Sequence, residues 1–178
     1  MHFFKTILLP ICTLAVVSCA NQGNNAANAA NTDTALNIAA PSDSQLDVTP
    51  LSGYFVKNTI QVTDSLTFWV INNQASFDSL FGMAQTMNTV IDKPDFGTQL
   101  VVAATMPPTY YNTQIQLASA TSDDLDNDAI MHFVAVANPD KSSAAIVPLW
   151  LGAVPKAGQR AFKLYTGDQL TQTITIQQ

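Results

Sequence analysis

The sequence predicts an α+β fold, namely a mostly antiparallel, sandwich-like β domain with one main helix. Short segments rich in β-branched and aromatic residues recur between residues 48 and 178, as is typical of strands. One segment, beginning near Ser76, instead spaces its apolar residues three and four apart, which is the period of an amphipathic helix. A chain of 178 residues fits one domain with a tail.

The expected strands follow one another closely along the chain. Residues 53–62 suggest two short strands, and residues 66–71 are aromatic and β-branched. Residues 99–105 form a nearly continuous apolar run, which indicates a central strand buried on both faces. Residues 113–117 and 170–176 alternate polar and apolar side chains, as half-buried strands do. The remaining expected strands cover residues 130–137, 145–154 and 161–165.

The expected helix has one apolar face. Ser76 fits the N-cap position, and Asp78 lies where the helix dipole favours a negative charge. Pro94 ends any continuation, and Gly82 costs about 1 kcal/mol of helix propensity. The apolar face consists of Phe77, Leu80, Phe81, Ala84, Met87 and Ile91.

Residues 1–18 are typical of a signal peptide. Lys5 supplies a positive charge, and an apolar run follows that ends at Val17. The run is about half the ~20 residues that a membrane-spanning helix needs. We therefore expect the segment to direct export and then be removed; the alternative is an ordinary secretory signal that is cut at a nearby alanine.

Residues 16–19, Val-Val-Ser-Cys, resemble the lipobox of bacterial lipoproteins, in which a diacylglyceryl group joins the cysteine thiol. The resemblance implies lipid attachment at Cys19, with acyl chains such as palmitate, and Ala20 in the next position implies the outer membrane. Each buried methylene adds about 0.8 kcal/mol, so two or three chains hold a protein on a membrane essentially permanently. We expect a lipid-anchored protein of the bacterial cell envelope.

Residues 19–47 differ in composition from the rest of the chain. They are rich in Ala and Asn and contain neither an aromatic residue nor a cation. Such a segment buries too little apolar surface to offset its ordering entropy, so we expect a flexible tether followed by a folded domain over residues 48–178. Because Cys12 leaves with the signal peptide and Cys19 carries lipid, the expected mature domain has no thiol for catalysis, disulfides or metal ligation.

Charge and composition argue against several function classes. The 13 acidic residues outnumber the 7 basic ones, for a net charge of −6, which argues against nucleic-acid binding. The expected mature chain has a single histidine, His132, and no Gly-x-Ser-x-Gly motif. A hydrogen-bonded sheet histidine is the expectation for His132. The sequence therefore predicts no enzyme and no cofactor.

A run of acidic residues offers a metal-binding alternative. Asp124, Asp126 and Asp128 have the spacing of the first three ligands of an EF-hand loop. Ala129 and Ala135, however, stand where that loop needs Gly and Glu. A solvated turn between two strands is the simpler explanation of the run, because Asp and Asn bond nearby backbone in turns. The alternative function is thus a calcium- or small-ligand-binding envelope lipoprotein.

The loop after the predicted central strand is the expected contact surface for a protein partner. Two prolines stop the strand, and two adjacent tyrosines follow, of which one is expected to face the core and the other solvent. An exposed tyrosine on a rigid loop binds well because it loses little entropy. In the alternative, both tyrosines pack over the end of the sheet. The expected surface comprises Pro107, Pro108, Thr109, Tyr110 and Tyr111, with Trp150 nearby.

The order of elements over residues 65–156 carries a family resemblance. An aromatic helix leads to Ile-Asp-Lys-Pro-Asp-Phe at residues 91–96, then come a strand, the Pro-Thr-Tyr loop, a second strand, an acidic turn, a third strand and Val-Pro-Lys. This order is similar to that of the C-terminal domain of PrcB-type protease-complex subunits, found in bacterial lipoproteins and secreted proteins.

The resemblance implies a non-catalytic, β-rich module that associates with a secreted protease. In that family the loop reads Pro-Thr-Gly-Gly-Tyr, whereas here Tyr110 and Tyr111 directly follow Pro108 and Thr109. Similar Pro-Thr-Gly-Tyr loops insert into the protease cleft in chagasin-type cysteine-protease inhibitors. The expected partners are thus a membrane, through the lipid, and a protein such as a secreted protease.

Overall fold

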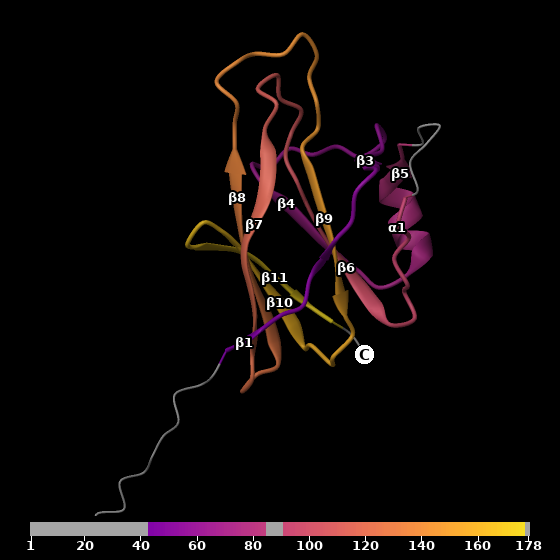
Figure 1. Ribbon diagram of the computed structural model, residues 1–178, viewed down its shortest axis with the longest axis vertical. Helices are drawn as coiled ribbons and strands as arrows, with labels where there is room; N and C mark the ends of the chain where they lie inside the picture. The colour runs from indigo at the N-terminus through magenta and orange to yellow at the C-terminus, as the bar shows by residue number, and fades with distance from the viewer. Residues whose placement is uncertain (1–42, 85–90, 177–178) are drawn as a thin grey trace, which may run out of the picture. The chain divides into compact units, whose positions relative to one another are not determined.

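The computed structural model describes residues 43–84 and 91–176, all of which lie in one compact unit of the chain. Strands account for most of the regular structure, and the described residues contain a single short helix (Figure 1). The prediction of a β-rich α+β domain is confirmed. Among residues 43–84 and 91–176, seven of the eight strand pairings are antiparallel, so the prediction of mostly antiparallel sheets is also confirmed.

One sheet has five strands in the order β1-β7-β8-β10-β11. β7 and β8 form a long hairpin, and the β8–β10 pair is the parallel one. The strands are β1 (Ser44–Gln45), β7 (Gln114–Asp123), β8 (Asp128–Val136), β10 (Ala161–Thr166) and β11 (Gln169–Thr175).

The second sheet has four strands in the order β2-β9-β6-β4, all antiparallel. β6 is an inner strand, and every residue from Leu100 to Thr105 is buried, so the prediction of a central strand is confirmed. The strands are β2 (Thr49–Pro50), β4 (Thr67–Ile71), β6 (Gln99–Thr105) and β9 (Leu149–Pro155).

Side chains from both sheets form one apolar core. Val102 of β6 and Phe133 of β8 belong to the same buried cluster. The ring of Phe133 lies 5.2 Å from Phe68 and 5.0 Å from Trp150, measured between centroids. Alternate residues of β6, such as Val101 and Ala103, belong to a second cluster on the other face of the four-stranded sheet. The four-stranded sheet is therefore covered on both faces, as the apolar run in β6 requires.

The helix is shorter than predicted. α1 spans Gln74–Leu80, and its N-cap is Asn73, whose side chain accepts a hydrogen bond from Ser76 N at 2.8 Å. The prediction of Ser76 as the N-cap is wrong. The N-cap lies three residues earlier, at Asn73, which caps the backbone N–H of Ser76. Phe77 points its ring into the second cluster, as the apolar face predicted.

The expected continuation of the helix is replaced by a strand. β5 (Phe81–Met83) pairs antiparallel with β3 (Tyr54–Val56). Gly82 allows this pairing, because a Cβ there would lie 2.4 Å from the ring of Phe55. The predicted helical face beyond Leu80 is therefore wrong at Phe81, and its member Met87 lies outside the described residues. In residues 53–62 only β3 forms, so one of the two strands expected there is absent from the described structure.

The ordered fold begins earlier than predicted. β1 lies within residues 19–47, the expected tether, and pairs with β7. Leu46 and Val48 pack against the shared core, and this apolar alternation holds the segment on the domain. The expected signal peptide, Cys19 and Ala20 lie outside the described residues. The described part of the chain contains no helix with the length and apolar character that crossing a bilayer requires.

Candidate functional site

The β6–β7 loop (residues 106–113) and the β8–β9 loop (residues 137–148) lie side by side beyond the same ends of the strands (Figure 1). We call these two loops, together with Val136 at the end of β8, the loop end. Backbone hydrogen bonds connect them: Asn138 N donates to Tyr111 O at 2.9 Å, and Ser142 N donates to Tyr110 O at 2.7 Å. Thr109 and Ile146 exchange two further bonds of 2.9 Å. The loop backbones are thus fixed by one another.

Four large apolar side chains at the loop end are exposed. Tyr110 and Tyr111 are each 47% exposed, and Val136 and Ile146 are each 51% exposed. The prediction that one tyrosine faces the core is wrong, because the loops pair through their backbones and neither ring is needed to fill the sheet end. Lys141 Nζ lies 5.2 Å from the centroid of the Tyr110 ring, a cation–π contact. We call the side chains of Tyr110, Tyr111, Val136 and Ile146 the aromatic patch, after its two tyrosines.

The remaining loop residues that the sequence singled out support the patch. Thr109 accepts a hydrogen bond from Tyr111 N on its hydroxyl, at 3.2 Å. Pro108 lines a cavity of about 170 Å³ with Ile60 and Val147 among its neighbours. The loop turns into β7 at Asn112, whose φ is +41°, and asparagine tolerates this left-handed region better than most residues. Neither tyrosine needs the freedom of a glycine.

Trp150 does not join this surface. It lies on β9, and its ring packs edge-on against Phe133 in the shared core. Gly152, two residues later, makes room for the ring, since a Cβ there would lie 2.5 Å from it. The signal for this placement was present in the sequence, because Trp150 and Val154 are on the same face of an alternating strand. Trp150 lies near the loop end, opposite Ala104, but its ring faces the core, so the prediction that it belongs to the contact surface is wrong.

The acidic turn, residues 123–128, closes the other end of the β7–β8 hairpin. The carboxylate of Asp123 accepts hydrogen bonds from Leu125 N at 2.9 Å and Asp126 N at 3.4 Å. Ser44 donates to Asp124 at 3.2 Å. Residues 43–84 and 91–176 contain no group of three or more acidic, His or Cys side chains arranged to hold a metal ion. The calcium alternative at Asp124, Asp126 and Asp128 therefore loses its geometric basis.

Asp128 explains why the three carboxylates do not converge. It is 8% exposed and forms an ion pair of 2.9 Å with Lys163 on β10. This hydrogen bond raises the pKa of Lys163, and the charges of Asp128, Asp126 and Asp123 add to the shift. Asp128 thus bonds within the sheet instead of contributing to a ligand set.

His132 is a structural sheet residue in this geometry. Its Nδ1 donates to Gly167 O at 2.8 Å, and its ring stacks on Tyr165 with 4.4 Å between centroids and 10° between planes. The hydrogen bond and the stacking use one nitrogen and one ring face, in agreement with the expected sheet histidine.

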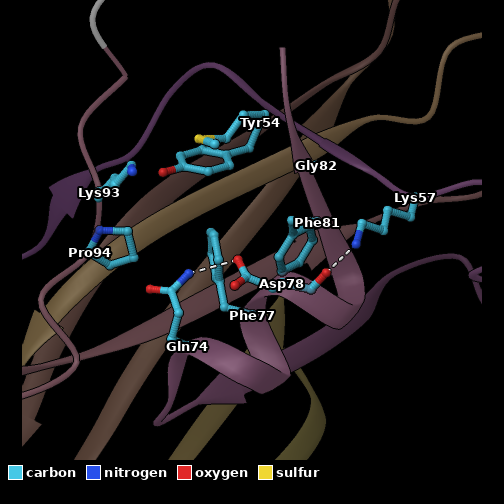
Figure 2. A pocket seen from close by; sticks show the side chains of 10 residues that line it. Tyr54, Lys57, Gln74, Phe77, Asp78, Phe81, Gly82, Lys93 and Pro94 are labelled. Atoms are coloured by element: carbon cyan, nitrogen blue, oxygen red, sulfur yellow. Dashed lines mark hydrogen bonds between the residues drawn. The ribbon is translucent and has the colours of Figure 1, made fainter. Parts of the chain in front are cut away.

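A cavity of about 530 Å³ between α1, β3 and β5 has no counterpart in the sequence predictions (Figure 2). Phe77 and Phe81 form its apolar wall and are almost fully buried. The cavity depends on β5 being a strand, which the helical period of this segment conceals. No local signal in the sequence could therefore have indicated it.

The polar groups around this cavity are largely bonded to the chain itself. Tyr54 Oη donates to Asp92 O at 2.9 Å. Gln74 donates to the Asp78 carboxylate at 2.7 Å, and Lys57 donates to Asp78 O (Figure 2). Burial raises the pKa of Tyr54, and the charges of Asp78 and Asp92 add to the shift. The arrangement fixes α1 on the sheet and leaves a mainly apolar hollow.

No protein-family model, curated protein or solved structure matches this chain. The loop end combines a fixed backbone, four exposed apolar side chains and a cation over one of the rings.

Proposed function

We propose that this protein is a lipid-anchored component of the bacterial cell envelope, at the outer membrane, whose domain binds another protein and performs no catalysis. The observation that carries the proposal is the aromatic patch, with Tyr110 and Tyr111 half exposed on loops whose backbones are fixed. Side chains held in this way bury large apolar area on binding and lose little entropy.

The scaffold below the loop end supports this function. We infer that the five- and four-stranded sheets pack face to face as a sandwich, because Val102 and Phe133, from different sheets, share one buried cluster. End loops on such a scaffold are positioned by rigid strands, as in many binding proteins.

The loop end lies far from the point where the described chain enters the domain. Ser44 pairs with Ser122, next to the acidic turn, so the described chain enters at that end. β7 has ten residues and is therefore ~30 Å long, with the loop end beyond its other terminus. The chain segment around Ser44 therefore leaves the aromatic patch open to a protein partner.

The class of partner follows from the family resemblance of residues 65–156. The PrcB-type likeness suggests a secreted protease, which the domain binds or modulates. Tyr110 and Tyr111 replace the family's glycines, so we propose contact through two aromatic rings in place of a flexible inserted loop.

The test is cross-linking in intact cells that carry the full-length lipoprotein. We expect the double variant Tyr110→Ala/Tyr111→Ala to reduce the yield of a specific cross-linked partner about tenfold, because two central aromatic contacts are lost. The matched control is Leu125→Ala, which removes a side chain that is 76% exposed at the acidic turn. An unchanged yield for the double variant, or an equal loss for Leu125→Ala, would refute the loop end as the interface.

The same preparation tests the anchor. Mass spectrometry of the membrane fraction should find a diacylglyceryl group on Cys19, and Cys19→Ser should shift the protein out of that fraction. A soluble, unmodified wild-type product would refute lipid anchoring. The binding proposal would not be affected, because the cross-linking experiment tests it separately.

A further inference from the structure

Strand β7 has an open edge next to the loop end. β1 covers only its last part: it pairs with Thr121 and Ser122, and Leu46 N donates to Ala120 O at 3.1 Å. The chain then crosses to β2 in the other sheet. Within the described part of the chain, residues 114–118 of β7 have β8 on one side and no strand on the other.

The pairing pattern shows which backbone groups face that open edge. Gly167 N donates to Phe133 O at 2.8 Å, so Phe133 directs its backbone groups away from β7. Leu117 lies directly opposite Phe133. In an antiparallel pair, the backbone N–H and C=O groups of two opposite residues either both point toward the partner strand or both point away from it. Leu117, and Ile115 two residues earlier, therefore direct N–H and C=O groups to the open side of the sheet.

The open edge lacks two of the features that discourage strand pairing, namely charged residues and proline. Natural edge strands usually carry charged residues or proline, but residues 114–118 read Gln-Ile-Gln-Leu-Ala. A register shift between Leu117 and Ser119 limits the regular edge at its far end. The open segment is thus short, uncharged and able to accept one more strand.

A hollow of about 510 Å³ lies at the far end of this edge, where β1 leaves β7, between Leu46 and Leu117. Tyr111 of the aromatic patch precedes the edge by three residues. An incoming segment would find backbone partners along the edge, and room for side chains where β1 leaves it.

We propose that the partner protein adds an extended, uncharged segment to this edge, antiparallel to β7 and in line with β1, while the aromatic patch contacts the side chains that follow. The proposal rests on the proposed function and specifies its partner as a strand-forming segment. Strand addition supplies affinity through main-chain hydrogen bonds and specificity through pockets for side chains. The open edge offers the hydrogen-bonding groups, and the hollow between Leu46 and Leu117 offers one such pocket.

The experiment uses the full-length protein in detergent and an immobilised library of random synthetic peptides about ten residues long, which span ~30 Å when extended. The best binder is then resynthesised with N-methyl groups on alternate residues, in two series of opposite register. Only one edge of the peptide can pair with β7, so we expect one series to lose affinity at least about tenfold and the other to bind as the parent does.

Two proline variants of the protein test the same pairing from the side of the sheet. Leu117→Pro removes an N–H from the β7 edge without removing a β7–β8 hydrogen bond, and we expect it to abolish peptide binding. Thr173→Pro is the matched control. Ile176 N donates to Arg160 O, so by alternation Thr173 faces the open edge of β11, the other outer strand. Amide exchange in the wild type provides a second readout, because bound peptide should slow the amides of Ile115 and Leu117.

Four results would overturn the addition of a partner strand at β7. Absence of any binding peptide, or equal affinity of both N-methyl series, would mean that main-chain pairing does not occur. Loss of binding in Thr173→Pro alone would move the site to β11, and a dimer that Leu117→Pro dissociates would identify a second copy as the occupant. If pairing holds but Tyr110→Ala/Tyr111→Ala leaves peptide affinity unchanged, the patch fails as the interface while strand addition stands.

Discussion

The two ends of the β7–β8 hairpin use their polar groups differently. At the acidic turn, side chains make the bonds: Asp123 accepts from turn amides, Asn127 donates to Gly158 O at 2.6 Å, and Asp128 pairs with Lys163. At the loop end, the two loop backbones bond to each other. The first end bonds its polar side chains internally and exposes one large apolar side chain, Leu125, whereas the second end exposes several.

This difference explains why the run of aspartates, although more conspicuous in the sequence, is a weaker candidate for a binding site than the two tyrosines. A run of aspartates suggests a cation site, but a turn that bonds its own amides and a neighbouring lysine has little capacity left to converge on an ion. Exposed tyrosines on a backbone-fixed loop have no such internal role. The predictions below test this contrast, beginning with the core residue that the sequence misplaced.

Trp150→Ala should have the largest effect, on stability. Its ring packs on Phe133 in the shared core, so we expect a loss of about 3 kcal/mol in the free energy of unfolding, because a large cavity remains. Urea denaturation of the full-length protein followed by circular dichroism measures it. Tyr111→Ala, at the exposed end, should change stability by less than about 1 kcal/mol. Equal effects of the two variants would contradict the contrast between core and patch.

The local sequence pattern was sufficient to predict a strand where burial of one strand face, or of a whole apolar run, determines the structure. The run over residues 99–105 predicted the buried strand β6 because no other element accommodates continuous burial so well. The pattern failed at Phe81, where apolar spacing favoured a helix but pairing with Val56, 25 positions earlier in the chain, produced a strand. Pairing between distant segments is not encoded in a local period, and it creates both the cavity beside α1 and the open edge of β7.

The two ends each contain one asparagine with positive φ, which allows a matched pair of variants. Asn127 (φ +56°) also donates to Gly158 O, whereas for Asn112 (φ +41°) the left-handed backbone is the feature that matters. We expect Asn127→Ala to cost about 2 kcal/mol, from backbone strain plus a lost hydrogen bond, and Asn112→Ala about 1 kcal/mol from strain. Thermal denaturation measures both.

Glycine substitutions separate the two contributions. Asn112→Gly should retain wild-type stability, because glycine accepts positive φ without strain. Asn127→Gly should remain destabilised by about 1 kcal/mol, since its side-chain bond is still lost. If both glycine variants behaved alike, the acidic turn would not depend on its side chains more than the loop end does.

The smallest expected effect concerns pH and the Asp128–Lys163 pair. The pKa of Lys163 is raised in the fold, so the folded protein holds this proton more tightly than the unfolded chain. The pair's contribution is then fully present below the unfolded lysine pKa of about 10.4 and is lost as pH rises through the higher folded value. Asp128→Asn should cost at most about 1 kcal/mol at neutral pH, because Lys163 is partly exposed. The difference between wild type and variant, measured by urea denaturation at several pH values, should shrink above about pH 10.4. A difference that stayed constant through that range would mean that Asp128 stabilises the acidic turn by packing and neutral hydrogen bonding, and the side-chain charges would have no part in the contrast with the loop end.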